Sequence, residues 1–166
     1  SMDKVRSKLI WRSLGLPTPE FHVVRRDQGA GPNLPEVDAP VMVKPAKEGS
    51  SLGVSKVTET AALADAVAHA MEFDDVVLIE QWIDGGEYTM SIVDDEPLPI
   101  IKLETPHEFY DYDAKYIADT TRYLCPCGLG DAALGSVTTL AVDAFAALGA
   151  SGWGRVDFML DGDGQP

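Results

Sequence analysis

The sequence predicts an α+β fold in which helices pack on antiparallel sheets. Three observations support this fold class. Short apolar runs alternate with clusters of Gly, Pro, Asp and Ser, which is typical of strands joined by turns. The alternating segment 87–93 is followed by Asp94-Asp95-Glu96 and a second apolar segment, 98–103, so these two segments should pair as a hairpin. Helical spacing of apolar residues is confined to separate segments between such runs.

Helices are predicted over residues 3–14, 61–71 and 136–148. Asp3 is a suitable N-cap for the first helix, and Gly15 should end it. In each of the other two segments one face carries apolar side chains at helical spacing. These are Leu63, Val67, Ala70 and Met71 in the earlier segment, and Val137, Ala141, Ala144 and Leu148 in the later one.

The predicted strands are short and are separated by turn residues. They cover 21–24, 41–44, 54–57, 76–80, 87–93, 98–103 and 156–160. Segments 41–44 and 54–57 are expected to be hairpin partners, whereas 26–40 and 105–122 are expected to be loops. Asp161 to Gly164 should form a turn, which predicts a further strand beyond it. Together with the tag-like Ser1-Met2, this turn leads us to expect a piece of a longer protein.

Composition limits the classes of function. The chain has 166 residues, enough for one domain or two small lobes, with 45% hydrophobic and 24% charged residues. The net charge of −14 disfavours nonspecific binding to nucleic acid or to an anionic membrane, because both require a basic surface. The sequence contains no apolar run near the roughly 20 residues that span a bilayer, and no secretory leader. Cys125 and Cys127 are too close for an unstrained bridge, so we expect reduced thiols in a cytoplasmic protein.

Residues 42–53 form a candidate phosphate clamp, with the sequence M-V-K-P-A-K-E-G-S-S-L-G. An apolar strand leads into a loop rich in Gly and Ser, and Lys44 and Lys47 lie at the junction. Backbone N–H groups of such a loop can surround phosphate oxygens, and lysine supplies the opposing charge. The run matches neither the P-loop nor the dinucleotide-binding pattern. An ordinary turn between two strands is the alternative.

Further motifs, taken in order, resemble the D-alanine–D-alanine ligase family of the ATP-grasp superfamily. They are Asp3-Lys4, the run 42–53, V-L-I-E-Q-W from Val77, F-Y-D-Y-D-A-K-Y from Phe109, and G-W-G-R-V-D-F-M-L-D from Gly152. The resemblance implies two small lobes with antiparallel sheets. Residues 20–103 would form the nucleotide-clamp lobe, and residues 1–19 with 104–166 would form parts of a second, incomplete lobe.

The resemblance implies a set of nucleotide-binding residues. Lys4, Lys44 and Lys115 would contact phosphates, and Ser51 would lie at the tip of the clamp. Glu80 would accept a hydrogen bond from the adenine amino group, beside Gln81, Trp82 and Ile83, and Glu87 would bind the ribose. The alternative for each charged residue is an ordinary solvated position at the end of a strand or helix.

The same resemblance implies three catalytic residues and one metal ligand. Arg155 would stabilise the transferring phosphoryl group, and Ser50 and Tyr116 would close the site over the substrate. Asp157 would bind magnesium, with manganese as a substitute. Arg155 and Asp157 alternate on one strand and so share a face. An exposed ion pair of small energetic value is the alternative for these two residues.

The implied activity is ligation of two D-alanine molecules through an acyl phosphate, driven by ATP and supplying peptidoglycan synthesis. The full-length enzyme would be a cytoplasmic homodimer, and the present chain alone would be inactive. The Tyr–Lys loop at 112–116 favours D-alanine over D-lactate as the acceptor. The alternatives are a related ligase with another acceptor and a nucleotide-binding domain without catalysis.

Overall fold

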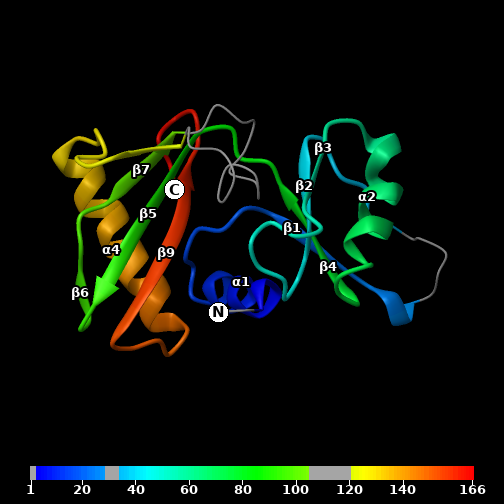
Figure 1. The fold of residues 1–166 in the computed structure, drawn as a ribbon, viewed down its shortest axis with the longest axis horizontal. Coiled ribbons are helices and arrows are strands. Elements are labelled where there is room, and N and C mark those ends of the chain that lie inside the picture. Colours follow the sequence, from blue (N-terminus) through cyan, green and yellow to red (C-terminus); the bar gives the residue numbers. More distant parts are fainter. Residues whose placement is uncertain (1–2, 29–33, 105–120) are drawn as a thin grey trace. The chain divides into compact units, whose positions relative to one another are not determined.

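The computed structural model describes residues 3–28, 34–104 and 121–166, which form two compact units (Figure 1). The first unit comprises Ser1–Lys8 and Pro19–Trp82, and the second comprises Leu9–Thr18 and Ile83–Pro166. The lobe boundaries proposed from sequence differ, because they grouped 83–103 with the clamp. In the structure this segment forms β-strands of the second unit, where its main partner is a strand near the end of the chain.

The first unit contains an antiparallel sheet with the strand order β1-β4-β2-β3. The strands are β1 (Phe21–Arg25), β2 (Val41–Pro45), β3 (Ser55–Val57) and β4 (Val76–Gln81). Strands β2 and β3 pair with Val41 opposite Val57, which confirms the predicted hairpin across residues 46–54. Two short 3-10 helices, η1 (Arg26–Gln28) and η2 (Thr60–Ala62), lie in the connections.

Each face of this sheet is covered by apolar side chains of a helix. Helix α2 (Leu63–Ala70) presents Leu63, Val67 and Ala70 to one face, where they pack with Val43 and Ile79. On the other face Val5, from the start of α1 (Lys4–Ser13), packs with Phe21, Ala46 and Leu78. Arg6 N–H donates to Asp3 Oδ1 at 2.9 Å, which confirms Asp3 as the N-cap of α1.

The second unit is built on a five-stranded antiparallel sheet. Its strands are β5 (Gly86–Val93), β6 (Glu96–Pro97), β7 (Ile101–Glu104), β8 (Arg122–Leu124) and β9 (Trp153–Leu160). They follow the order β6-β5-β7-β8, and β9 also pairs with β5. Tyr88, Met90 and Ile92 alternate into the core as predicted, and Val137 and Ala141 of helix α4 (Asp131–Ala147) pack on them.

Two elements are longer than the sequence patterns predicted. Helix α4 begins at Asp131 instead of 136, because Gly130 provides an extended N-cap residue and Asp131 places a carboxylate at the positive helix N-terminus. Strand β9 begins at Trp153 instead of 156 because it pairs with β5 over that strand's whole length. The predicted turn after β9 is confirmed, since Gly164 N–H donates to Asp161 O at 3.0 Å.

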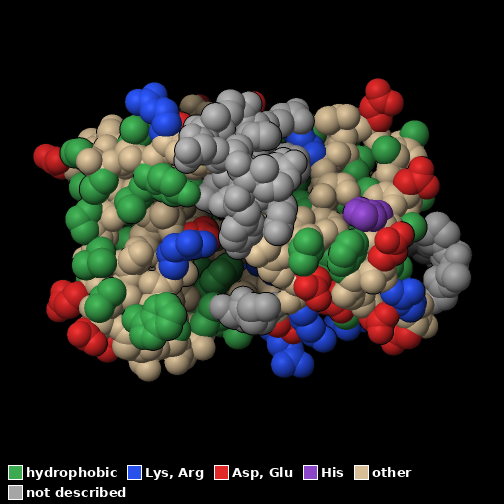
Figure 2. Space-filling view, viewed as in Figure 1, with side chains coloured by type: hydrophobic (Ala, Val, Ile, Leu, Met, Phe, Trp, Pro, Cys, Tyr) green, Lys and Arg blue, Asp and Glu red, His purple; other side chains and the backbone are tan. Residues whose placement is uncertain are grey.

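Some large apolar side chains remain at the surface of the second unit. Hydrophobic side chains are scattered over its strands on the face seen in Figure 2, and the exposed ones include Val93, Leu98, Tyr123 and Trp153. Within the described ranges no helix has the length and apolar character needed to cross a membrane. Cys125 and Cys127 are both free thiols, as expected.

Candidate functional site

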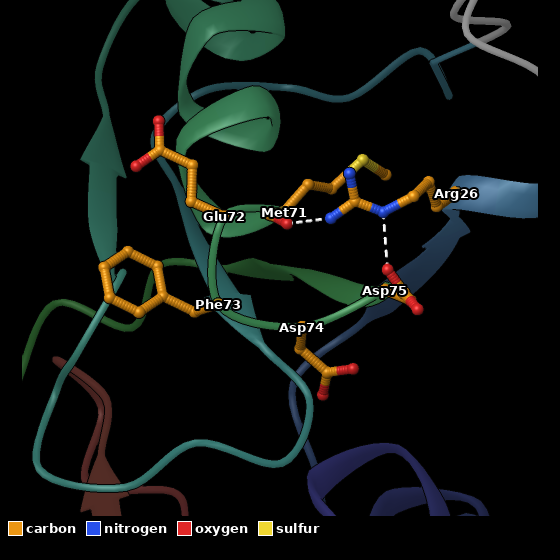
Figure 3. Close-up of a pocket in the computed structure, with 6 residues that line it drawn as sticks. All are labelled: Arg26, Met71, Glu72, Phe73, Asp74 and Asp75. Carbon is orange, nitrogen blue, oxygen red and sulfur yellow. Dashed lines mark hydrogen bonds and ion pairs between the residues drawn. The ribbon is translucent and has the colours of Figure 1, made fainter.

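One hollow, with a volume of about 270 Å³, lies in the first unit beside the connection from α2 to β4 (Figure 3). It is lined by Arg26 and by residues 71–75. Arg26 donates to the carbonyl of Met71 and, through Nε at 2.5 Å, to Asp75 Oδ1. None of the predicted site residues lines this hollow, and its one arginine already pairs with two of the other lining residues. We therefore locate the candidate site elsewhere.

Strand pairing brings Lys44 and Glu80 together on one face of the first sheet. In the β2–β4 register Lys44 lies opposite Leu78, and Met42 lies opposite Glu80. Side chains two residues apart on a strand share a face, so Lys44 and Glu80 are diagonal neighbours within reach of each other. Lys44 Nζ donates to Glu80 Oε2 at 2.5 Å. The predicted clamp lysine and the predicted base-recognising carboxylate are therefore in direct contact.

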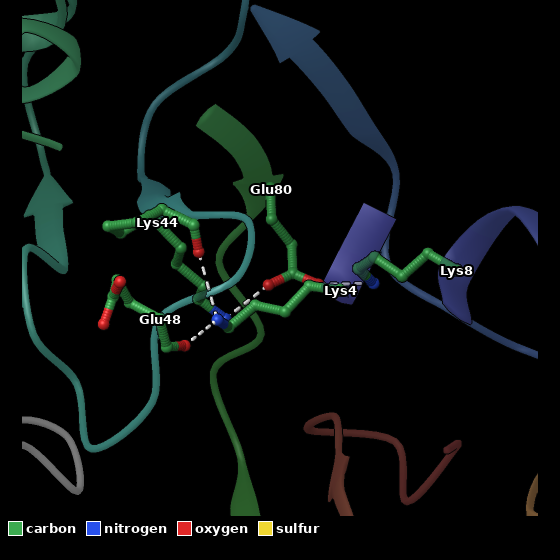
Figure 4. Close-up of polar contacts among 6 residues, drawn as sticks. Lys4, Lys8, Lys44, Glu48 and Glu80 are labelled. Carbon is green, nitrogen blue, oxygen red and sulfur yellow. Dashed lines mark hydrogen bonds and ion pairs between the residues drawn. The ribbon is translucent and has the colours of Figure 1, made fainter. Parts of the chain in front are cut away.

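A second lysine, Lys8 of α1, contacts the other oxygen of the Glu80 carboxylate (Figure 4). Lys8 is buried, and its ammonium lies 5.4 Å from the centre of the Phe21 ring. Phe21 is opposite Glu80 in the β1–β4 register, so helix α1 brings Lys8 over the same face that Lys44 occupies. Each carboxylate oxygen of Glu80 consequently has its own ammonium partner.

The charges of this cluster determine the protonation of Glu80. Burial by itself would raise the pKa of Glu80, but the ammonium groups of Lys44 and Lys8 outweigh burial and hold that pKa below its ordinary value. Burial lowers the pKa of Lys8, and the Glu80 carboxylate opposes this effect. Two cations act on Glu80, one at each carboxylate oxygen. Glu80 is therefore an ionised carboxylate at neutral pH.

Lys4 joins helix α1 to the loop that follows β2. Its Nζ donates to the carbonyl of Pro45 at 3.0 Å and to that of Glu48, and its backbone N–H donates to Ala46 O at 2.9 Å. Burial, followed by the nearby charge of Lys44, lowers the pKa of Lys4. Lys4 thus lies beside the clamp loop and holds backbone carbonyls of that loop.

The clamp loop has an unusual backbone at its tip. Ser50 and Ser51 both have positive φ, at 53° and 59°, a region that residues other than glycine rarely adopt. Gly53 has a φ of 66°, and a Cβ there would lie 2.6 Å from the Phe73 ring and 2.8 Å from Pro45. Lys47 N–H donates to Asp74 Oδ2 at 2.8 Å. The loop is therefore held at both ends while its two serines carry local strain, which often marks functional sites.

The predicted base-binding segment continues from Glu80 along the end of β4. Gln81 is exposed, Trp82 is half-buried with the ammonium of Lys56 4.0 Å from its ring centre, and Ile83 is half-buried. The division between the two units falls between Trp82 and Ile83. Glu87 is half-buried on β5, in register with Leu103 and Met159.

Arg155 and Asp157 lie together on the exposed face of β9. Arg155 Nε is 2.8 Å from Asp157 Oδ1, and its Nη2 is 3.0 Å from Oδ2. Thr89, buried on β5 and opposite Asp157 in the register, donates from its hydroxyl to Asp157 Oδ1 at 2.7 Å. The predicted pairing of Arg155 and Asp157 on one face is present, and Thr89 fixes the orientation of the carboxylate.

Asp157 has the hard oxygen donors that magnesium prefers. Among the described residues, however, no group of three or more His, Cys, Asp and Glu side chains could hold a metal ion. The donor type of Asp157 therefore fits magnesium, while the described part of the chain does not complete a set of three such ligands around it. Tyr112, Lys115 and Tyr116 lie outside the described residues.

Sequence reasoning missed two residues, Lys8 and Thr89. Lys8 follows Lys4 by one helical turn, so the sequence does contain a signal that both ammonium groups share a face of α1. Lysine is rarely buried without a charged partner, and that partner is a strand residue distant in sequence. Thr89 gives no local signal, because its role depends on the pairing of β5 with β9.

Comparison with known proteins places this geometry in a family. Residues 10–166 match the family model described as the D-Ala D-Ala ligase C-terminus. A D-alanine–D-alanine ligase from Alcanivorax borkumensis is 51% identical over 164 residues, which is 99% of this chain and 52% of that protein. The chain thus spans about half the length of the curated relatives it matches.

Solved structures show the same likeness. A D-Ala:D-Ser ligase from Enterococcus faecalis has a TM-score of 0.80 at 29% identity, over 99% of this chain and 50% of that one. A D-alanine–D-alanine ligase from Bacillus anthracis in complex with ATP has a TM-score of 0.78 at 28% identity, over 97% of this chain and 51% of that one.

Proposed function

Because the chain belongs to the D-alanine–D-alanine ligase family, with the ATP-grasp fold, we propose that it supplies the nucleotide-binding part of an ATP-dependent ligase. That enzyme would join two D-alanine molecules for peptidoglycan synthesis in the cytoplasm, as a homodimer. The observation that carries the proposal is the cluster of Lys4, Lys44 and Glu80 at the start of the clamp loop. It combines cations for phosphates with a carboxylate for a nucleobase amino group.

The predicted cofactor-binding residues bind and orient the nucleotide in this proposal. Lys44 and Lys4 contact the phosphates, and Ser51 and the loop N–H groups close over them. Glu80 accepts from the adenine amino group, and the strand end at Gln81, Trp82 and Ile83 lies along the base. Glu87 accepts from ribose hydroxyls. Lys115 adds a further phosphate contact.

The reaction itself needs positioning and charge stabilisation and no protein nucleophile. The carboxylate of the first D-alanine attacks the γ-phosphorus, ADP leaves, and an acyl phosphate forms. The amine of the second D-alanine then attacks the acyl carbon, and phosphate leaves with formation of the peptide bond. Arg155 stabilises the negative charge that develops in both steps. Ser50 and Tyr116 exclude water, which would otherwise hydrolyse the acyl phosphate.

Asp157 would supply one carboxylate ligand to magnesium or manganese, and such an ion neutralises phosphate charge when it is bound. Thr89 and Arg155 hold the Asp157 carboxylate in a fixed orientation. A ligase with another acceptor is the main alternative, since a structural relative uses D-serine. Product analysis of the full-length enzyme with D-alanine, D-serine and D-lactate as acceptors distinguishes these activities.

The test of nucleotide binding is a calorimetric titration of Mg-ADP into this chain and into Lys44→Ala. We expect binding to the unchanged chain and at least tenfold weaker binding to the variant, because a charge-assisted contact to phosphate is lost. Lys102→Ala is the matched control, since Lys102 pairs with Glu104 at 3.1 Å in the second unit. Equal affinity of Lys44→Ala and the unchanged chain would contradict the proposed phosphate clamp.

A further inference from the structure

The function proposed above assigns no role to the buried ammonium of Lys8. Lys8 lies beneath the site, against Phe21, and contacts the Glu80 oxygen that Lys44 does not use. A buried lysine with its charge intact is costly unless it is paired. We therefore looked for the role of Lys8 in its contact with Glu80.

We propose that Lys8 is a positioning residue for nucleotide recognition, and this inference rests on the proposed function. Lys8 holds Glu80 Oε1 permanently, whereas Oε2 exchanges partners. In one arrangement Oε2 binds the Lys44 ammonium, as the structure shows. In the other arrangement Oε2 accepts from a nucleobase amino group, and Lys44 turns to the phosphates of the same nucleotide.

The charges explain why two lysines are needed for one carboxylate. Phosphate would draw Lys44 away from Glu80, and a buried carboxylate left without a cation is strongly disfavoured. Lys8 remains in place, so Glu80 stays ionised and correctly oriented after Lys44 has moved. Lys8 is buried on α1 with its ammonium 5.4 Å from the Phe21 ring centre, and this burial keeps it beside Glu80.

The exchange couples recognition of the base to recognition of the phosphates. An amino group at Oε2 replaces the hydrogen bonds that Lys44 gives up. A carbonyl at the same position of the base would face the carboxylate as a second acceptor and would leave Lys44 on Glu80. Lys8, by fixing Oε1, thereby contributes to the preference for adenine over a 6-oxo base, although it touches neither the base nor the phosphates.

The experiment compares Mg-ADP with Mg-inosine diphosphate by calorimetric titration of five proteins. These are the unchanged chain, Lys8→Met, Lys8→Arg, Glu80→Gln, and the Lys8→Met/Glu80→Gln double variant. For Lys8→Met we expect about tenfold weaker Mg-ADP binding and a reduced preference for Mg-ADP over Mg-inosine diphosphate. Lys8→Arg should keep most of that preference, because it keeps the cation at Glu80. Lys102→Met, which removes a lysine from a Lys–Glu pair in the second unit, should bind both nucleotides as the unchanged chain does.

The double variant tests whether Lys8 acts through Glu80. If it does, Lys8→Met makes no further difference to either affinity once Glu80→Gln is present, and this comparison remains decisive should Lys8→Met alone not fold. Additive losses in the double variant, or an unchanged nucleotide preference in Lys8→Met, would overturn the inference. Absence of Mg-ADP binding to the unchanged chain would instead contradict the proposed function on which the inference rests.

Discussion

Each of the two units carries an ionic cluster of predicted site residues, and the two clusters differ in burial. In the first unit the side chains of Lys8 and Glu80 are only 8% and 9% exposed. In the second unit those of Arg155 and Asp157 are 63% and 53% exposed. Both clusters consist of opposite charges in direct contact, so the difference between them lies in access of water.

Because of this difference in burial, the two clusters should contribute differently to stability. A buried pair that loses one partner leaves an uncompensated charge, so the pair around Glu80 contributes to the fold as well as to the site. An exposed pair contributes little to stability because water replaces it readily. Arg155 can therefore turn from Asp157 to a ligand without weakening the second unit, while Thr89 continues to hold the Asp157 carboxylate. Substitutions in the two clusters should accordingly affect folding very differently.

The largest effect is expected for Lys8→Met. Removal of this buried cation should lower the free energy of unfolding by about 3 kcal/mol, at the low end for a broken buried pair because Lys44 remains near Glu80. Urea unfolding followed by circular dichroism measures the change. The partly exposed Lys102–Glu104 pair provides the control, and Lys102→Met should change stability by less than about 1 kcal/mol. Equal losses of unfolding free energy in the two variants would contradict the view that burial makes the Glu80 cluster more important for stability.

A smaller effect is expected for Gly53→Ala in the clamp loop. The positive φ and the close approach of Phe73 and Pro45 should together cost about 2 kcal/mol. Gly49 belongs to the same loop, has no positive φ and has open space around its Cβ position, so Gly49→Ala is the matched control. Thermal unfolding of both variants gives the comparison. A loop that is readily deformed would show the same small change for both.

The dependence of the unfolding free energy on acid pH should reveal how much ionised Glu80 stabilises the fold. Its pKa in the folded state is lowered below the ordinary 4.5, so the unfolded chain binds the proton first as the pH falls. The stabilisation from Glu80 is therefore complete above about pH 4.5 and is lost as the pH falls through the folded-state pKa. Unfolding free energies measured from pH 7 to pH 3 should decline less steeply below pH 4.5 for Glu80→Gln than for the unchanged chain. Parallel curves would exclude this contribution.

The smallest effect on folding is expected for Arg155→Ala. The exposed Arg155–Asp157 pair should contribute less than about 1 kcal/mol, and urea unfolding should barely change. Ligase activity of the full-length enzyme should nevertheless fall by at least a hundredfold, since loss of a charge at a developing anion commonly costs about that much. A large loss of stability together with a small loss of activity would reverse the proposed roles of the two clusters.

Much of the fold follows from local patterns in the sequence. The β2–β3 hairpin, the alternation of Tyr88, Met90 and Ile92, and the N-cap at Asp3 all depend on residues close together in the chain. The pairing of β5 with β9 joins segments far apart, and no local periodicity reveals it. For the same reason the lobe boundary predicted from sequence put segment 83–103 in the first lobe.

The site was predicted only in part for a related reason. Lys44 and Glu80 were identified through a resemblance between motifs, and the strand register then brought them into contact. The contribution of Lys8 arises from the packing of α1 over Phe21, which a helical pattern alone does not determine. Electrostatic support from a residue that touches no ligand becomes visible only in three dimensions.

The most direct measurement is an NMR titration of the Glu80 side-chain carboxyl carbon in the unchanged chain and in Lys8→Met. We expect a Glu80 pKa below 4.5 in the unchanged chain, a higher pKa once Lys8 is replaced, and no change in the Lys102→Met control. A Glu80 pKa that is the same with and without Lys8 would contradict the claim that this buried lysine holds the carboxylate for nucleotide recognition.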